Sequence, residues 1–245
     1  MKLIRKALAF VPVLLLLANT YPLVVDKSSC HSIQPISILT SPLLKHLAAP
    51  VAEYDVWNLR SCGLSRDAFE MGLKGYNFFM ERNRLKKTNI LTIIDYSQPS
   101  SKRRLYVLDM QNKRVIFNTL VAHGLNSGYN YARSFSNDEE SFKSSLGFFI
   151  TRGTYTGLNG YSLKLEGCEK GINNNALDRA IVLHGAGYVS EDFLRSKGYL
   201  GRSLGCPAVP LALAQKIIDK IKNGSCMFLY HQLKTYTAQS KILDS

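Results

Sequence analysis

Apolar side chains recur at helical spacing between residues 51 and 84. This periodicity predicts one helix over residues 51–60 and a longer one over residues 65–84. Ser65 stands where a helix cap is expected, and Asp67 lies in the first turn. The aromatic side chains of the longer helix fall on one face, which predicts packing in the core rather than a ligand-binding surface. Gly72 and Gly75 either weaken this helix or let another element pack closely against it.

The period changes after residue 89, where β-branched and aromatic residues form short runs bounded by turn residues. The first three runs are joined by short turns, which predicts an antiparallel meander. Later runs predict a hairpin with its tip at residues 154–160, and residues 211–222 predict a helix. The expected strands cover residues 90–95, 104–109, 115–122, 146–151, 161–165, 181–183 and 226–230. Together they predict a mainly β domain.

The first 25 residues have the pattern of an export signal. Three basic residues precede an apolar run over residues 7–18. An uncleaved membrane anchor is the alternative, although the run is short and Pro12 interrupts it. We therefore expect an exported protein of the periplasm or cell envelope, with membrane anchoring through the N-terminus left open.

Composition restricts the partners and cofactors. The net charge of +13 suits a protein that works beside an anionic polymer or surface, although scattered basic residues on a solvated surface explain it equally well. No basic helix or RNA-binding aromatic motif is present, which argues against nucleic acid as a partner. The cysteines lack metal-ligand spacing, so we expect neither a metal nor a cofactor. If Cys206 stays free, the other four pair in one of three ways or stay reduced: Cys30, Cys62, Cys168 and Cys226.

The candidate chemistry lies between His184 and Cys206. His184 ends an apolar run and is followed by Gly185, while Cys206 lies in a tight turn just ahead of the helix predicted over residues 211–222. A nucleophilic thiol needs a base, and His184 is the natural candidate. Backbone N–H groups at Leu204, Gly205 and Cys206 can form an oxyanion hole. A buried structural cysteine and histidine are the alternative, but the glycine-rich frames on both sides favour an active pair.

The pattern of His184-Gly185 followed by Ser203-x-Gly205-Cys206 resembles the signature of the L,D-transpeptidase family, cysteine enzymes of the bacterial cell wall. The similarity is strongest to the murein L,D-transpeptidase catalytic-domain proteins. It implies that Cys206 is the nucleophile, that His184 is its general base and that the turn at residues 204–206 holds the oxyanion. It also implies an L,D-transpeptidase-like β-sandwich with a few peripheral helices.

Two departures from the family pattern are visible. Better-studied members have a second histidine where this chain has Leu204, and an arginine or asparagine where it has Pro207-Ala208-Val209. The group that orients His184 is therefore left open. With the resemblance, we expect an export signal or anchor over residues 1–25, a linker over 26–50, a helical segment over 51–87 packed on a catalytic domain over 88–235, and a tail over 236–245.

Several further side chains are candidates for substrate binding. His123 precedes a glycine at a strand end and is a rival to His184. Arg202 can clamp a substrate carboxylate or simply pair with an acid. Tyr155 and Tyr161 either form walls of the cleft or pack on the sheet. Beside the catalytic pair itself, the candidates are Ser203 and Gly185.

The resemblance implies an exported L,D-transpeptidase that acts on peptidoglycan stem peptides through a thioester acyl-enzyme. Its products would be cross-links or stem peptides with an exchanged D-amino acid. One alternative is an L,D-carboxypeptidase that trims tetrapeptides with water as acceptor. Another is a catalytically weak wall-binding protein, which the basic composition and Leu204 would suit.

Overall fold

The computed structural model describes residues 53–245, so the predicted export signal, the predicted linker and Cys30 lie outside the described residues. The longer helix expected before the sheet is confirmed as α2 (Arg66–Glu81), and the Ser65 hydroxyl accepts from the Ala68 N–H as its cap. The shorter helix expected over residues 51–60 is interrupted by a turn at residues 57–58, after which the short helix η1 (Leu59–Cys62) follows. The remaining helices are η2 (Leu125–Ser127), α3 (Glu191–Lys197), α4 (Leu211–Ile221) and α5 (Lys234–Gln239).

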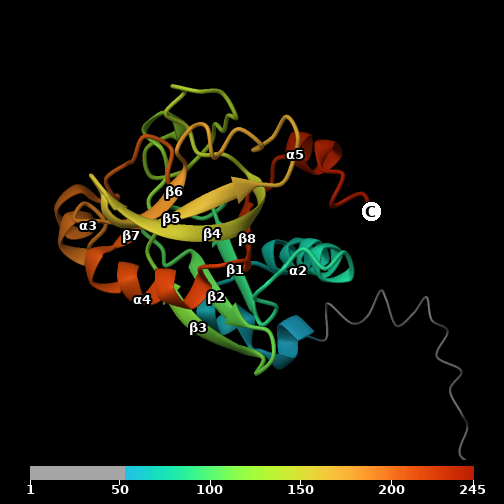
Figure 1. Cartoon of the computed structure of the whole chain (residues 1–245). Coiled ribbons are helices and arrows are strands. Elements are labelled where there is room, and N and C mark those ends of the chain that lie inside the picture. Colours follow the sequence, from blue (N-terminus) through green and yellow to red (C-terminus); the bar gives the residue numbers. More distant parts are fainter. Residues whose placement is uncertain (1–52) are drawn as a thin grey trace, which may run out of the picture. The chain divides into compact units, whose positions relative to one another are not determined.

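The strands form one eight-stranded sheet in the order β3-β2-β1-β8-β4-β5-β6-β7 (Figure 1). The β1–β8 and β6–β7 pairs are parallel and the other neighbours are antiparallel. The predicted mainly β fold and the antiparallel meander are therefore confirmed. The strands are β1 (Ile90–Asp95), β2 (Leu105–Asp109), β3 (Arg114–Thr119), β4 (Gly147–Gly157), β5 (Gly160–Gly167), β6 (Val182–Ala186), β7 (Ala208–Pro210) and β8 (Cys226–Tyr230).

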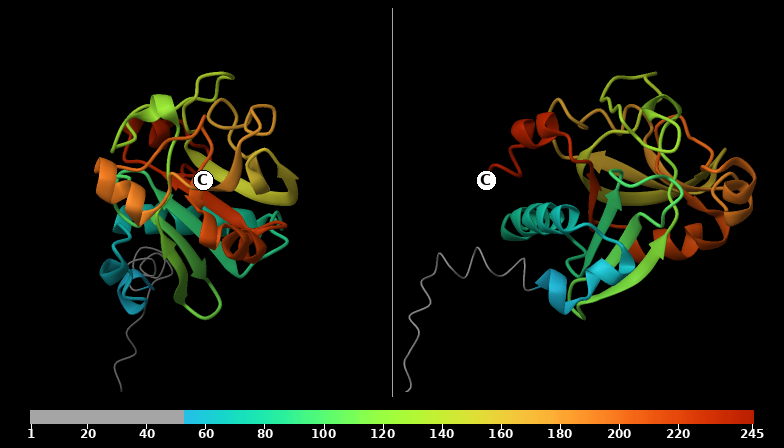
Figure 2. Two further views of the ribbon diagram at one scale, coloured as in Figure 1. Left: turned by 90° about the vertical axis from the view of Figure 1, so that its left-hand side faces the viewer. Right: turned by 180° about the vertical axis from the view of Figure 1, so that it is seen from behind.

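Helices cover the central strands, and every residue of β1, β2, β6 and β8 is buried. The aromatic face of α2 packs on β1 and β8, as the periodicity predicted. An ideal Cβ on Gly75 would fall 2.1 Å from the Phe148 ring, and one on Gly72 would fall 2.9 Å from Ile93. The two glycines therefore allow close approach of the helix to the sheet. The two helices lie apart in Figure 2, because α2 packs on β1 and β8, whereas α4 packs on β5, β6 and β7.

The strand β4 is longer than predicted. It runs to Gly157, and the turn before β5 contains only Leu158 and Asn159. Residues 154–156 were expected in the hairpin tip, but their β-branched and aromatic side chains continue the pairing to β5. Both strands are long and curved in Figure 1.

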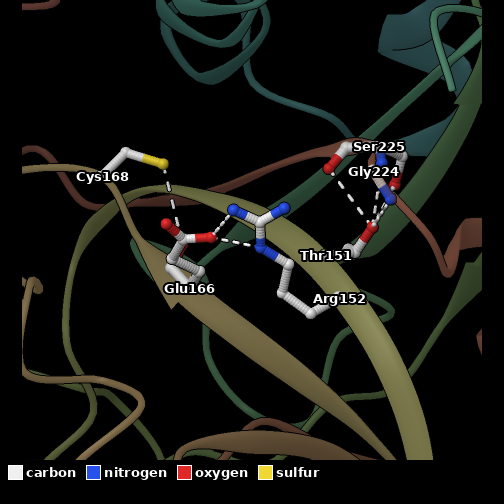
Figure 3. Close-up of polar contacts among 6 residues, drawn as sticks. All are labelled: Thr151, Arg152, Glu166, Cys168, Gly224 and Ser225. Atoms are coloured by element: carbon white, nitrogen blue, oxygen red, sulfur yellow. Dashed lines mark hydrogen bonds and ion pairs between the residues drawn. The ribbon is translucent and has the colours of Figure 1, made fainter. Parts of the chain in front are cut away.

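A buried hydroxyl on β4 ties the α4–β8 turn to the sheet (Figure 3). Thr151 Oγ1 donates to the Ile221 carbonyl at 2.7 Å and accepts from the backbone N–H groups of Ser225 at 2.9 Å and Gly224 at 3.3 Å. The next residue, Arg152, pairs with Glu166 across the β4–β5 ladder. This part of the sheet is therefore held by side-chain contacts as well as by the ladder.

The last ten residues contribute to the core, although the sequence suggested a tail. Tyr236 donates to the buried Glu169 carboxylate at 3.2 Å, the Ser240 hydroxyl donates to the other oxygen of that carboxylate, and Ile242 is buried. The four cysteines of the described residues are free thiols. No helix within residues 53–245 is long and apolar enough to cross a membrane.

Candidate active site

The parallel pairing of β6 with β7 brings His184 next to the turn that holds Cys206. His184 lies opposite Ala208, two residues beyond Cys206, and the His184 N–H donates to the Pro207 carbonyl at 3.4 Å. Two residues far apart in the sequence thus share one edge of the sheet. This strand register explains how the histidine and the cysteine of the sequence pattern come to lie close together.

The helix α4 decides which face of the sheet His184 uses. An ideal Cβ on Gly185 would lie 2.8 Å from the Ala214 Cβ, so Gly185 faces α4. Because successive side chains on a strand alternate between faces, His184 points to the opposite face. Gly185 was predicted near the substrate, but the structure uses it to bring α4 close to β6.

The His184 ring has a fixed tautomer. Its Nδ1 lies 3.0 Å from the Gly185 carbonyl oxygen, and a carbonyl can only accept. In the neutral ring, Nδ1 therefore carries the hydrogen and Nε2 is the basic nitrogen. Burial lowers the pKa of His184 below its ordinary value, so the ring is neutral at neutral pH. The Gly185 carbonyl is thus the orienting group that the sequence left open.

The Cys206 thiol is half-buried and protonated at rest. Its Sγ accepts from the Val182 N–H at 3.4 Å and donates to the Ala180 carbonyl at 3.7 Å. Burial raises the pKa of the thiol, against smaller lowering effects from the Val182 N–H and the charge of Arg179. The hydrogen bonds of residues 53–245 do not include one between Cys206 and the His184 ring. In this structure the thiol is therefore hydrogen-bonded to the Ala180 carbonyl and not to the His184 ring.

Ser203 shapes the turn that presents the thiol. Its buried hydroxyl accepts from the Gly205 N–H at 3.1 Å and donates to the Cys206 carbonyl at 2.6 Å. Gly205 has a φ of +125°, which residues with a Cβ rarely adopt. The Gly205 N–H is used inside the turn, so the candidate donors of the predicted oxyanion hole are reduced to the N–H groups of Leu204 and Cys206.

Arg179 is a residue that the sequence reasoning missed. Its guanidinium lies beside the turn at residues 203–206, with one nitrogen 3.5 Å from the place that a Gly205 Cβ would occupy. Its positive charge lowers the pKa of the Cys206 thiol. No local signal marked it, because its partners come from a loop some 40 positions earlier. The guanidinium donates to the carbonyls of Ser136 and Lys143 and to the hydroxyls of Ser141 and Ser145 at 2.6–3.2 Å.

His123 lies in the core rather than on the surface. It is fully buried, its Nδ1 accepts from Arg104 at 2.7 Å, and its Nε2 donates to the Gly128 carbonyl at 3.2 Å. Burial and the nearby charge of Arg104 lower the pKa of His123 to about 3. Both ring nitrogens are therefore engaged inside the protein, and neither is available to a substrate or to Cys206.

The other predicted contacts divide between the face of the sheet that His184 uses and the scaffold. Tyr161 donates to Asp219 at 2.8 Å and so packs on α4. Tyr155 is exposed and lies in the same cross-strand row as His184, with Ser162 between them. Arg202 lies over the Tyr129 ring at 4.3 Å, and the ion pairs of the described residues do not include it. Within residues 53–245 no group of three potential metal ligands is present.

A search of the curated proteins finds no match. Among solved structures, an L,D-transpeptidase from Mycobacterium smegmatis is similar at 12% identity and a TM-score of 0.38, over 58% of this chain and 59% of that one. The helical cell shape determining protein Pgp2 from Campylobacter jejuni matches at 12% identity and 0.41, over 69% and 59%. An L,D-transpeptidase from Stackebrandtia nassauensis matches at 13% identity and 0.36, over 68% of both.

The sequence model of the L,D-transpeptidase catalytic domain matches residues 60–230, well over half of the chain. This range includes α2, all eight strands, His184 and Cys206. The chain therefore belongs to the L,D-transpeptidase catalytic-domain family.

Proposed function

We propose that this protein is an exported cysteine L,D-transpeptidase that acts on peptidoglycan stem peptides through a thioester on Cys206. Its family acts on peptidoglycan peptides. The single observation that carries the proposal is the β6–β7 register, which brings a histidine of fixed tautomer beside the cysteine turn. The basic composition suits work beside an anionic wall.

The reaction starts from a neutral pair. Burial raises the thiol pKa and lowers the imidazole pKa, so Cys206 begins as a thiol and His184 as a free base. When a substrate carbonyl approaches, Nε2 of His184 takes the thiol proton and the sulfur attacks the carbonyl carbon. Arg179 stabilises the thiolate as it forms. The N–H groups of Leu204 and Cys206 are the candidate donors to the oxyanion.

The tetrahedral intermediate then collapses to an acyl-enzyme. The C–N bond to the terminal D-alanine breaks, and His184 returns the proton to the leaving amine. The acyl group stays on Cys206 as a thioester. An amine from a neighbouring stem, or a free D-amino acid, attacks the thioester. His184 removes the amine proton, the C–S bond breaks as the new amide forms, and His184 returns the proton to the departing Cys206 thiolate.

The test is an exchange assay. The protein is incubated with a tetrapeptide muropeptide and a distinctive D-amino acid, and product masses are read. We expect exchange of the terminal D-alanine, complete loss of exchange in Cys206→Ala, and normal exchange in Cys62→Ala, a matched change at another half-buried cysteine. Tripeptide alone would assign the activity to a carboxypeptidase. No change on monomeric or cross-linked substrates would leave the wall-binding hypothesis.

A further inference from the structure

Three loops meet to form one surface, and one of them leads directly into Cys206. They cover residues 124–133, 141–145 and 202–205. The Leu125 N–H donates to the Ser203 carbonyl at 2.7 Å, and the Ser144 hydroxyl donates to the Gly205 carbonyl at 3.0 Å. In Figure 2 the connection between β3 and β4 gathers at one end of the sheet. Whatever binds these loops is therefore next to Cys206.

This surface carries many exposed hydrophobic side chains. The described residues expose ten large hydrophobic side chains, and five of them belong to these three loops. Exposed apolar side chains that are gathered in one place mark interaction surfaces more often than scattered ones do. The five side chains are Leu125, Tyr129, Tyr131, Phe142 and Leu204.

The tyrosine part of the surface is held in place. Tyr129 is 67% exposed, yet the Arg202 guanidinium lies 4.3 Å over its ring and the Tyr199 ring meets it edge-on at 5.9 Å. Tyr131 is 45% exposed, with Arg133 at 5.9 Å from its ring. A hollow of about 340 Å³ lies among residues 128–131 and Arg133. We call Tyr129, Tyr131, Arg133 and Arg202 the tyrosine–arginine platform.

The backbone beneath the platform is anchored from two sides. The Gly128 carbonyl accepts from the buried His123 at 3.2 Å and from Arg202 at 3.4 Å. The Asn130 carbonyl accepts from the Ser100 N–H at 2.6 Å. A loop that only covers the core has no need to hold exposed aromatic rings in fixed positions. Preorganised rings lose little entropy on binding, which favours a binding role.

We propose that the tyrosine–arginine platform binds the glycan strand to which the substrate peptide is attached. A pyranose ring offers C–H faces to tyrosine rings, while its hydroxyl and N-acetyl oxygens accept hydrogen bonds from guanidinium groups. No carboxylate lines the hollow. Arg202 stands four positions before Cys206, so a glycan on the platform would lie beside a stem peptide at the thiol. This inference rests on the proposed function.

The test separates binding from turnover. Binding is measured with the Cys206→Ala protein and two probes: peptide-free glycan strands and a neutral N-acetylglucosamine oligomer. The neutral probe matters because a protein of charge +13 attracts any polyanion. We expect both probes to bind, and we expect Tyr129→Ala to weaken both by about tenfold or more. Tyr129→Phe keeps the ring and retains binding, as does Val56→Ala, which trims an exposed apolar side chain elsewhere.

Three outcomes overturn the inference. The first is that neither probe binds. The second is that Tyr129→Ala binds as well as the parent does. The third is that binding is confined to the anionic strands and vanishes with salt, or that anionic lipid vesicles bind in place of glycan; binding of vesicles through Tyr129 would assign the platform to a membrane.

A kinetic readout links the platform to the reaction. In the active protein we expect a lower KM for a disaccharide-tetrapeptide than for the free tetrapeptide, with similar kcat. Tyr129→Ala should remove that KM difference. Glycan binding without any turnover would contradict the proposed function alone. Turnover without glycan binding would contradict this inference alone.

Discussion

His123 is expected to make the protein sensitive to acid. Its Nδ1 accepts a hydrogen bond from Arg104, a fully buried arginine that also donates to the Val121 and Gln98 carbonyls. Protonation would turn that acceptor into a donor that faces a guanidinium. The anchor on the Gly128 carbonyl, and with it the loop beside Cys206, should then loosen.

The magnitude follows from the pKa of His123, which is about 3 in the folded protein against an ordinary 6.5. At 1.36 kcal/mol for each pH unit, this difference corresponds to about 5 kcal/mol. Between these pH values the unfolded chain binds the proton and the folded protein does not. The free energy of unfolding must therefore fall as the pH drops through this window. Burial lowers the pKa of His184 as well, which adds a contribution of the same sign.

The assay compares urea unfolding of the parent protein and His123→Gln between about pH 7 and pH 4. Glutamine can accept from Arg104 and donate to Gly128, but it does not titrate. The parent should lose up to about 1.4 kcal/mol more stability for each pH unit than the variant. His123→Ala should be less stable by about 1–3 kcal/mol at every pH, because Arg104 loses its acceptor. Parallel pH curves for the parent and His123→Gln would refute the reasoning.

Three further predictions concern the site and its scaffold. The value of kcat/KM should fall below pH 6.5, where His184 takes up a proton, and above pH 9, where Cys206 loses one. In a thiolate–imidazolium pair the thiol would instead give the acid-side fall and the imidazole the alkaline-side fall, and that assignment would contradict the neutral pair. Arg179→Gln should raise the thiol pKa further and slow iodoacetamide alkylation near pH 7, because the lowering effect of the guanidinium is lost, whereas the exposed Arg103→Gln should leave the alkylation curve unchanged. Thr151→Val should lower the free energy of unfolding by about 1–3 kcal/mol in urea, with the exposed Thr156→Val nearly neutral; equal losses would argue against the buried hydroxyl as a tie.

Local chemistry accounts for what could be predicted from the sequence. The Ser65 cap, the apolar face of α2 and the antiparallel meander depend on residues close together in the chain, where propensity and periodicity act. The catalytic candidates were recognisable for the same reason. Each is set among small residues within a few positions, so His184 and Cys206 could be named without knowledge of the fold, and the resemblance that placed the chain in its family used the same residues.

Long-range contacts decided the rest. The role of His123 depends on its hydrogen bond with Arg104, and Tyr161 donates a hydrogen bond to Asp219 on α4. Because α4 covers one face of the sheet, strand alternation leaves His184 on the opposite face. The Gly185 carbonyl can orient the His184 ring only in the folded backbone. Arg179 is held beside the turn at residues 203–206 by hydrogen bonds to a loop that is distant in the sequence. By itself the sequence identified His184 and Cys206 as the candidate catalytic residues. Tertiary structure decided their tautomers, pKa values and neighbours, because burial and charge act through space rather than along the chain.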